Sequence, residues 1–119
     1  MGTWGTEIFE DDMACDVRDI YQDMIGNGVS CEEATNKILK DYESDLNKFP
    51  ETANIFWLAL AKAQIEAGET DKRIIAKAIE MIDDGIDILN WKKLDADPET
   101  IKERQEVLKI FRVELEPHK

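Results

Sequence analysis

Helical periodicity is the feature that most constrains the fold of this chain of 119 residues. From Asp11 onward, apolar residues recur every three or four positions, which is the spacing of one face of an α-helix. No segment shows the alternation of apolar and polar residues that is typical of a half-buried strand. The sequence therefore predicts an all-α fold in one compact domain, residues 1–119, in which residues 1–10 form a non-helical segment packed on the helices.

About five helices are expected, and the third differs in kind from the others. The run Ile55–Ala61 is apolar on nearly every side, and a helix without a polar face is normally surrounded by other helices. We therefore expect this helix, at about 53–67, to be central. Residues 86–96 are expected to be irregular. The remaining predicted helices span about 11–25, 30–48, 71–84 and 97–115.

Four side chains are predicted to act as structural anchors. Trp4 and Phe9 belong to an opening segment whose large apolar residues are expected to fill a gap in the core; the alternative is that Trp4 is a half-exposed anchor for a partner. Trp57 and Gln64 lie seven residues apart, on one face of the central helix. A buried amide needs several hydrogen-bond partners, so Gln64 is expected to hold backbone, such as that of residues 2–5; the alternative is a pocket residue.

The charge of the chain restricts its partners. The net charge is −12, and it is uneven: residues 1–60 hold 13 acids and 4 bases, whereas residues 61–119 hold 14 acids and 11 bases. Nucleic acids and anionic membranes are bound through Lys and Arg, so neither is an expected partner. A negative field favours a basic protein partner, although acidity can also serve solubility alone. No apolar run approaches the ~20 residues of a membrane span, so a cytoplasmic location is expected.

The inventory of catalytic side chains is short. The only histidine is His118, next to the C-terminus, which removes histidine-based triads and nearly all zinc sites. No glycine-rich phosphate loop is present. We therefore expect no enzymatic activity, no catalytic residues, no cofactor and no metal site.

A row of carboxylates is the candidate binding site. Its members fall at steps of four, three and four, so they line one side of the first helix: Asp12, Asp16, Asp19 and Asp23. Such a row can be a solvated helix face, can meet the lysines and arginines of a partner, or can hold a hard cation. A cation site is the least favoured, because calcium requires six to eight oxygens that converge from a loop.

Four stretches of the chain are distinctive: Met-Gly-Thr-Trp-Gly at 1–5, Ile-Phe-Glu-Asp-Asp at 8–12, Phe-Trp-Leu-Ala-Leu-Ala at 56–61 with Gln64, and Gly-Ile-Asp at 85–87 with Trp91. In these stretches the chain resembles a family of small bacterial proteins of unknown function, recognised by a Met-Gly-(Thr/Ala)-Trp-Gly opening. The chain departs from that pattern at Glu7, where the family has Gly. The resemblance implies a bacterial cytosolic protein and assigns no catalytic residue.

Small acidic helical proteins also resemble, in type, the immunity proteins of bacterial toxin systems. The function expected from the sequence is therefore a non-enzymatic acidic protein that blocks or sequesters a basic partner, such as a toxin domain. The alternatives are a housekeeping or regulatory interaction domain and, least favoured, a hydrolase that uses the carboxylates of the first helix.

Overall fold

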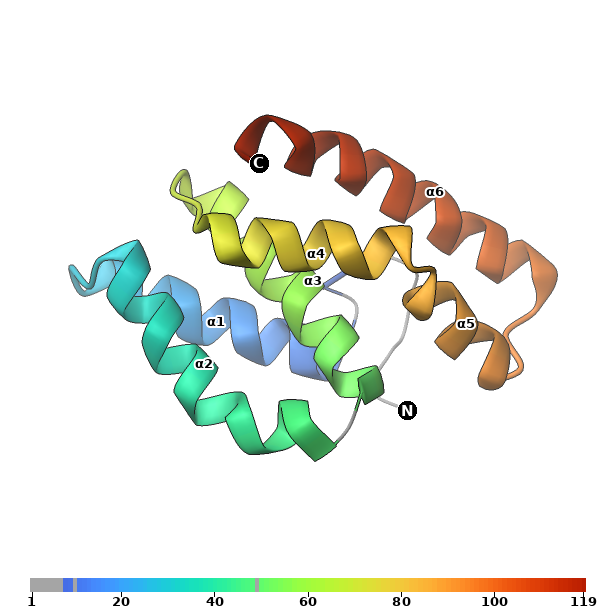
Figure 1. Cartoon of the computed structure of the whole chain (residues 1–119), viewed down its shortest axis with the longest axis horizontal. Helices are drawn as coiled ribbons and strands as arrows, with labels where there is room; N and C mark the ends of the chain where they lie inside the picture. The colour runs from blue at the N-terminus through green and yellow to red at the C-terminus, as the bar shows by residue number, and fades with distance from the viewer. Residues whose placement is uncertain (1–7, 10, 49) are drawn as a thin grey trace.

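The computed structural model describes residues 8, 9, 11–48 and 50–119, which form six α-helices and a final 3₁₀ turn, with no β-strand among them (Figure 1). The all-α prediction is confirmed. The helices are α1 (Asp12–Gly26), α2 (Cys31–Lys48), α3 (Pro50–Ala67), α4 (Lys72–Asp83), α5 (Ile86–Lys93) and α6 (Pro98–Leu115), and the 3₁₀ turn η1 spans Glu116–His118.

Short polar side chains fix where four of the helices begin. The Asp11 carboxylate accepts from the backbone N–H groups of Met13 and Ala14, which have no carbonyl partner within the helix. Three other residues cap their helices through a side-chain oxygen in the same way: Ser30 at α2, Asp71 at α4 and Asp97 at α6. The residues at each of these helix starts therefore determine where the helix begins.

Helix α3 occupies the centre of the fold, as its apolar composition predicts. It packs against α1, α2, α4 and α5. The α1–α2 hairpin covers one side of it and α4 covers another, while α6 lies at the periphery, along α4 and α5 (Figure 1). The buried residues of α3 include apolar side chains and two amides: Asn54, Phe56, Leu58, Ala59, Leu60, Ala61, Ala63 and Gln64.

The prediction of an irregular stretch at 86–96 is wrong for residues 86–93, which form α5. Gly85 ends α4 by adopting a positive φ of 72°, a conformation that costs a glycine little. The chain turns there and resumes as a helix of only eight residues. So short a helix is unstable alone, and its Asp87 side chain is buried against other helices. Tertiary contacts, rather than local periodicity, therefore stabilise α5.

The central helix begins at Pro50 instead of about Ala53, because proline fits the first turn of a helix. At the other end of the chain, Ile8 is 2% exposed and belongs to the core. Phe9 is half-buried; its ring lies 4.8 Å from the guanidinium carbon of Arg18, and its carbonyl oxygen accepts a hydrogen bond from the Cys15 thiol. Trp4 lies outside the described residues.

Candidate protein-binding site

Helix α1 presents its four-aspartate row to solvent. Asp12, Asp16, Asp19 and Asp23 are all exposed, and their spacing places them within one narrow arc of the helix. The buried residues of α1 lie on the opposite side of the helix: Ala14, Val17 and Tyr21. We call this aspartate row the acidic face.

Most of the acidic face is not neutralised by neighbouring bases. Asp19 accepts from Arg18 at 3.1 Å, with 65% of its side chain still exposed. In the described part of the chain, Asp12, Asp16 and Asp23 form no ion pair. An exposed carboxylate without a basic neighbour keeps its full charge available to a partner.

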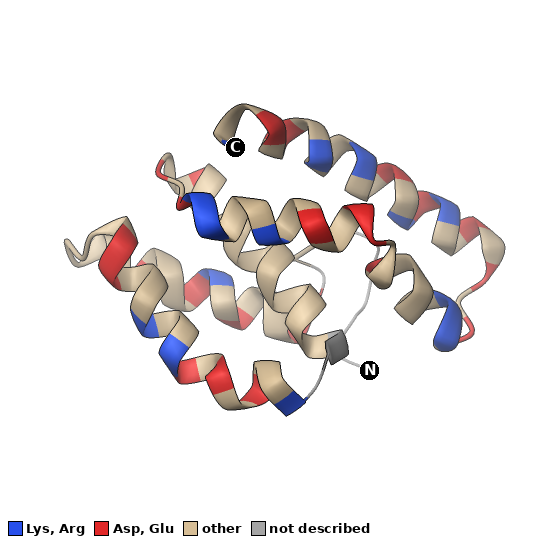
Figure 2. Cartoon of the chain, in the orientation of Figure 1, with Lys and Arg blue, Asp and Glu red and all other residues tan. Residues whose placement is uncertain are grey.

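Helix α2 extends this negative surface. Burial, followed by the charges of Asp16, Asp45 and Asp41, raises the pKa of Tyr42 above its usual value of 10.0. Asp41 is also within 3.6 Å of Lys37. Acidic segments are prominent on both helices in Figure 2.

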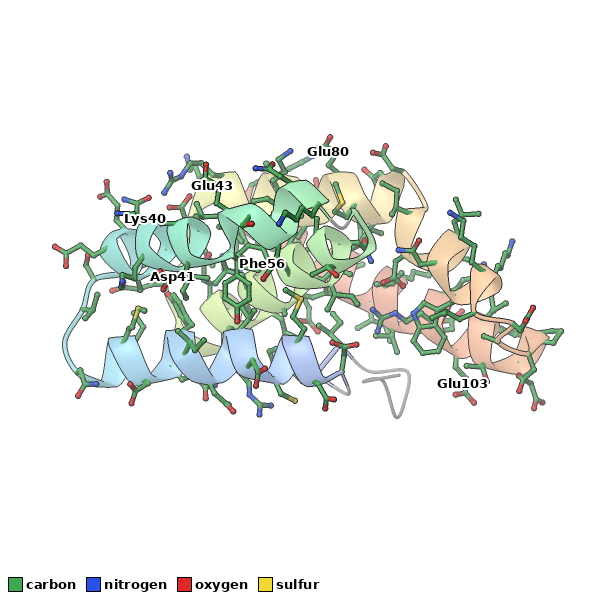
Figure 3. The ribbon with its side chains drawn as sticks, turned by 90° about the horizontal axis from the view of Figure 1, so that it is seen from below. Lys40, Asp41, Glu43, Phe56, Glu80 and Glu103 are labelled. Carbon is green, nitrogen blue, oxygen red and sulfur yellow. The ribbon has the colours of Figure 1, made fainter. Side chains whose placement is uncertain are left out.

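The ring of Tyr42 anchors this junction to the core. It lies 5.1 Å from the ring of Phe56, a fully buried residue of α3. Figure 3 shows Phe56 inside the molecule between α1 and α2, whereas Glu43 and Glu80 lie at the surface. The helices that carry the negative surface are therefore packed against the core. Because they are already ordered, little conformational entropy would be lost when this surface binds a partner.

The described carboxylates do not converge on a metal site. Among the described residues, no group of three or more His, Cys, Asp or Glu side chains is placed to hold a metal ion. The four aspartates of α1 point outward in a line, and a line supplies only one or two oxygens at any point. His118 lies in η1, half-exposed.

Trp57 lies at a groove between α2 and α3. The groove has a volume of about 410 Å³, and its lining is Leu39, Lys40, Glu43, Leu46, Asn47, Ala53 and Trp57. Trp57 is half-buried, and the Lys77 ammonium lies 5.8 Å from its ring. One face of α3 is therefore partly open at Trp57 and closed at Gln64, which has no exposed surface.

Gln64 joins three elements through its amide. Its Nε2 donates to the Thr35 hydroxyl of α2 at 2.8 Å, and its Oε1 accepts from the backbone N–H of Asp71 at 2.9 Å. The amide thus holds backbone, as a clamp would, but that of the α3–α4 connection. The backbone of residues 2–5, suggested from the sequence, lies outside the described residues.

A buried ion pair was not anticipated from the sequence. Arg104 of α6 donates to both carboxylate oxygens of Asp87 on α5, at 2.7 and 2.9 Å, and Asn54 of α3 donates to the same carboxylate at 2.8 Å. Asn54, Asp87 and Arg104 are at most 4% exposed. The guanidinium carbon of Arg104 also lies 5.4 Å from the Trp91 ring.

One signal for this network was present in the sequence. Arg104 stands three residues after Ile101 and four before Leu108, so it occupies a position on the apolar stripe of its helix. A charged residue at such a position is rarely buried unless it is paired. Its partner could not be identified, because Asp87 lies in the stretch that was expected to be irregular.

A second buried polar group lies where α1 meets α2. Tyr21 has no exposed surface, and its hydroxyl makes no hydrogen bond within the described residues. Burial, followed by the adjoining Cys31 thiol and the charges of Glu69 and Asp71, raises the pKa of Tyr21 well above its usual value. Both cysteines, Cys15 and Cys31, are free thiols.

No helix in the described residues is long and apolar enough to cross a bilayer. Comparison of the chain with protein-family models, with curated proteins and with solved structures found no match.

Proposed function

We propose that this chain is a non-enzymatic acidic binding protein that blocks or sequesters a basic protein partner. The observation that supports the proposal most directly is the exposure of the acidic face on a helix whose opposite side is fully buried. The partner would meet Asp12, Asp16, Asp19 and Asp23, with Asp41 and Asp45 of α2 beside them. No nucleic acid, membrane, cofactor or metal takes part in this proposal.

The partner class follows from charge. A surface of this sign attracts lysine- and arginine-rich proteins and raises their association rate more than it deepens their affinity. Nuclease toxins have basic active sites, and an immunity protein that covers such a site in the cytoplasm is the specific form of the proposal. A regulatory interaction domain would use the same surface. A carboxylate-dependent hydrolase is the least favoured alternative, because the four aspartates of α1 lie in one row on a single exposed helix face.

Affinity capture from the native cell tests the proposal. The variant D19K/D23K changes the net charge from −12 to −8 at the centre and end of the acidic face. Lysine at position 23 lies in the last turn of α1, where a positive charge suits the helix dipole, so the fold should remain intact. We expect the wild-type protein to retain a basic protein that D19K/D23K retains in smaller amount.

The matched control is D84K/E103K, which makes the same change in net charge at two exposed residues outside α1 and α2. It should retain the partner. Stopped-flow association with the captured protein should then show slower binding and a flatter salt dependence for D19K/D23K only. Equal association rates for all three proteins at low salt would mean that the acidic face only confers solubility.

A further inference from the structure

The outward side of α6 carries exposed apolar residues. Ile110 and Val113 are 60% and 69% exposed, more than any other large apolar side chain described. They lie one turn apart, on the side of α6 away from its buried residues Leu108, Phe111 and Leu115. Figure 1 places α6 at the edge of the molecule, with its outer side uncovered.

The negative charge on the outer side of α6 is concentrated in the first half of the helix, unlike the charge on α1, which runs along the whole helix. The outer side of its first half carries three glutamates and one lysine: Glu99, Glu103, Glu106 and Lys102. Glu103 lies on the outside of the molecule in Figure 3. The outer side of its second half carries one exposed base and one exposed acid, Lys109 and Glu114. The two exposed apolar residues therefore lie on the half of the outer side of α6 that carries the less negative charge, where a second acidic copy is repelled less.

We infer that the outer side of α6 is a contact between two copies of this chain, with the two α6 helices antiparallel. A two-fold axis between residues 111 and 112 places Ile110 of each copy against Val113 of the other, which is the a-to-d' packing of antiparallel helices. Both apolar residues are then covered by a single self-complementary contact.

The charges select the antiparallel orientation. In a parallel pair Glu103 and Glu106 would each face the same residue of the second copy, and like charges would meet at two successive layers. In the antiparallel pair the acidic first half of α6 lies beside the C-terminal end of the other copy, where Lys119 is. Lys109 lies beside Glu116 of the second copy, on the same edge of the contact.

The contact is small, so the dimer should be weak. With this axis, residues 108–115 of α6 face the same residues of the second copy, so the buried area lies below the value of about 1,200 Å² at the low end of specific interfaces. The contact leaves the acidic face of α1 free, so it does not depend on the proposed function.

Sedimentation velocity of the full chain between about 10 µM and 1 mM tests the inference. We expect the weight-average mass to rise with concentration, and V113K to lower dimer affinity at least tenfold. The control is L94K, which places the same charge at an apolar residue that is 57% exposed outside α6. It should dimerise like the wild type. A wild-type protein that remains monomeric at 1 mM, or equal losses in V113K and L94K, would overturn the inference.

Two further variants test the orientation. In a parallel pair Lys109 would lie beside Glu114 of the second copy, so E114Q would weaken the dimer. In the antiparallel pair the two Glu114 residues share one edge, so E114Q should leave affinity unchanged or raise it. K109E should weaken the dimer severalfold. Weakening by E114Q would overturn the antiparallel arrangement, and unchanged far-UV circular dichroism would show that each variant folds.

Discussion

Asp87 connects three helices through one carboxylate. It accepts from Asn54 on α3 and from Arg104 on α6 while lying on α5 itself. The attraction of a buried ion pair is largely offset by the desolvation of both charges, so such a pair adds less stability than its geometry suggests. Its consequence is specificity, because helices that shift register leave charges buried without this partner.

We expect D87N to lower the free energy of unfolding by about 3 kcal/mol, since removing one charge of a buried, hydrogen-bonded ion pair is strongly destabilising. Urea unfolding at pH 7 measures the change. The control is R112M, which removes an arginine that pairs with Asp83 and Glu116 and is 29% exposed. Ion pairs in contact with solvent contribute little, so R112M should lower the free energy of unfolding much less than D87N does. Equal costs would contradict the role given to burial.

Tyr21 gives the unfolding equilibrium a specific pH dependence. Its folded-state pKa is raised above the usual 10.0, so both states hold the phenolic proton below about pH 10. Above that pH the unfolded state loses the proton first, and stability falls with rising pH. We expect Y21F to lose less stability than the wild type between pH 9 and pH 11, by about 1 kcal/mol at the upper end.

At pH 7 the same variant should be neutral, or stabilised by about 1 kcal/mol, because the hydroxyl it removes is buried without a hydrogen bond in the described residues. Urea unfolding at several pH values measures both effects. A loss of more than 1 kcal/mol at pH 7 would mean that the hydroxyl has a stabilising partner.

At the scale of elements, two glycines in helical surroundings have opposite roles. Gly85 adopts a positive φ of 72° between α4 and α5, whereas Gly26 lies in the last turn of α1 without a positive φ. An added Cβ would meet no atom within 4 Å at either position. Backbone conformation, rather than space, therefore decides the effect of alanine at each.

We predict that G85A loses about 1 kcal/mol of stability, because alanine is strained at positive φ. G26A should gain roughly 0.5 kcal/mol, since alanine favours the helix and restricts the unfolded chain. Thermal unfolding of the two variants measures the contrast. A shift of the same sign in both would show that the α4–α5 turn is not fixed by the conformation of Gly85.

At the scale of the whole molecule, charge opposes folding. The chain has a net charge of −12, and its excess negative side chains repel one another more strongly when the chain is compact. Salt screens this repulsion over a Debye length of about 10 Å at 0.1 M. We expect the urea midpoint to rise between 0.05 M and 0.5 M NaCl, and to rise less for D19K/D23K. A midpoint that falls with salt would mean that attractive ion pairs outweigh the net repulsion.

The local pattern of residues determined much of this protein. Apolar spacing identified the all-α class, the central helix and the approximate bounds of five helices, and aspartate spacing placed the acidic face on the outside of α1. These features depend on contacts within one or two helical turns, or on the solvation of single side chains. A sequence carries that information directly.

The formation of α5 and the partners of the buried polar side chains were decided by the tertiary structure alone. Helix α5 forms although its own sequence is ambiguous, because Asp87 is held by residues 33 positions before it and 17 positions after it. The Gln64 amide forms hydrogen bonds with Thr35 and the Asp71 backbone, although many other groups in the chain could have satisfied it. The partner of a buried polar group is set by which distant segments the packed fold brings within hydrogen-bond distance, and periodicity contains no information about that pairing.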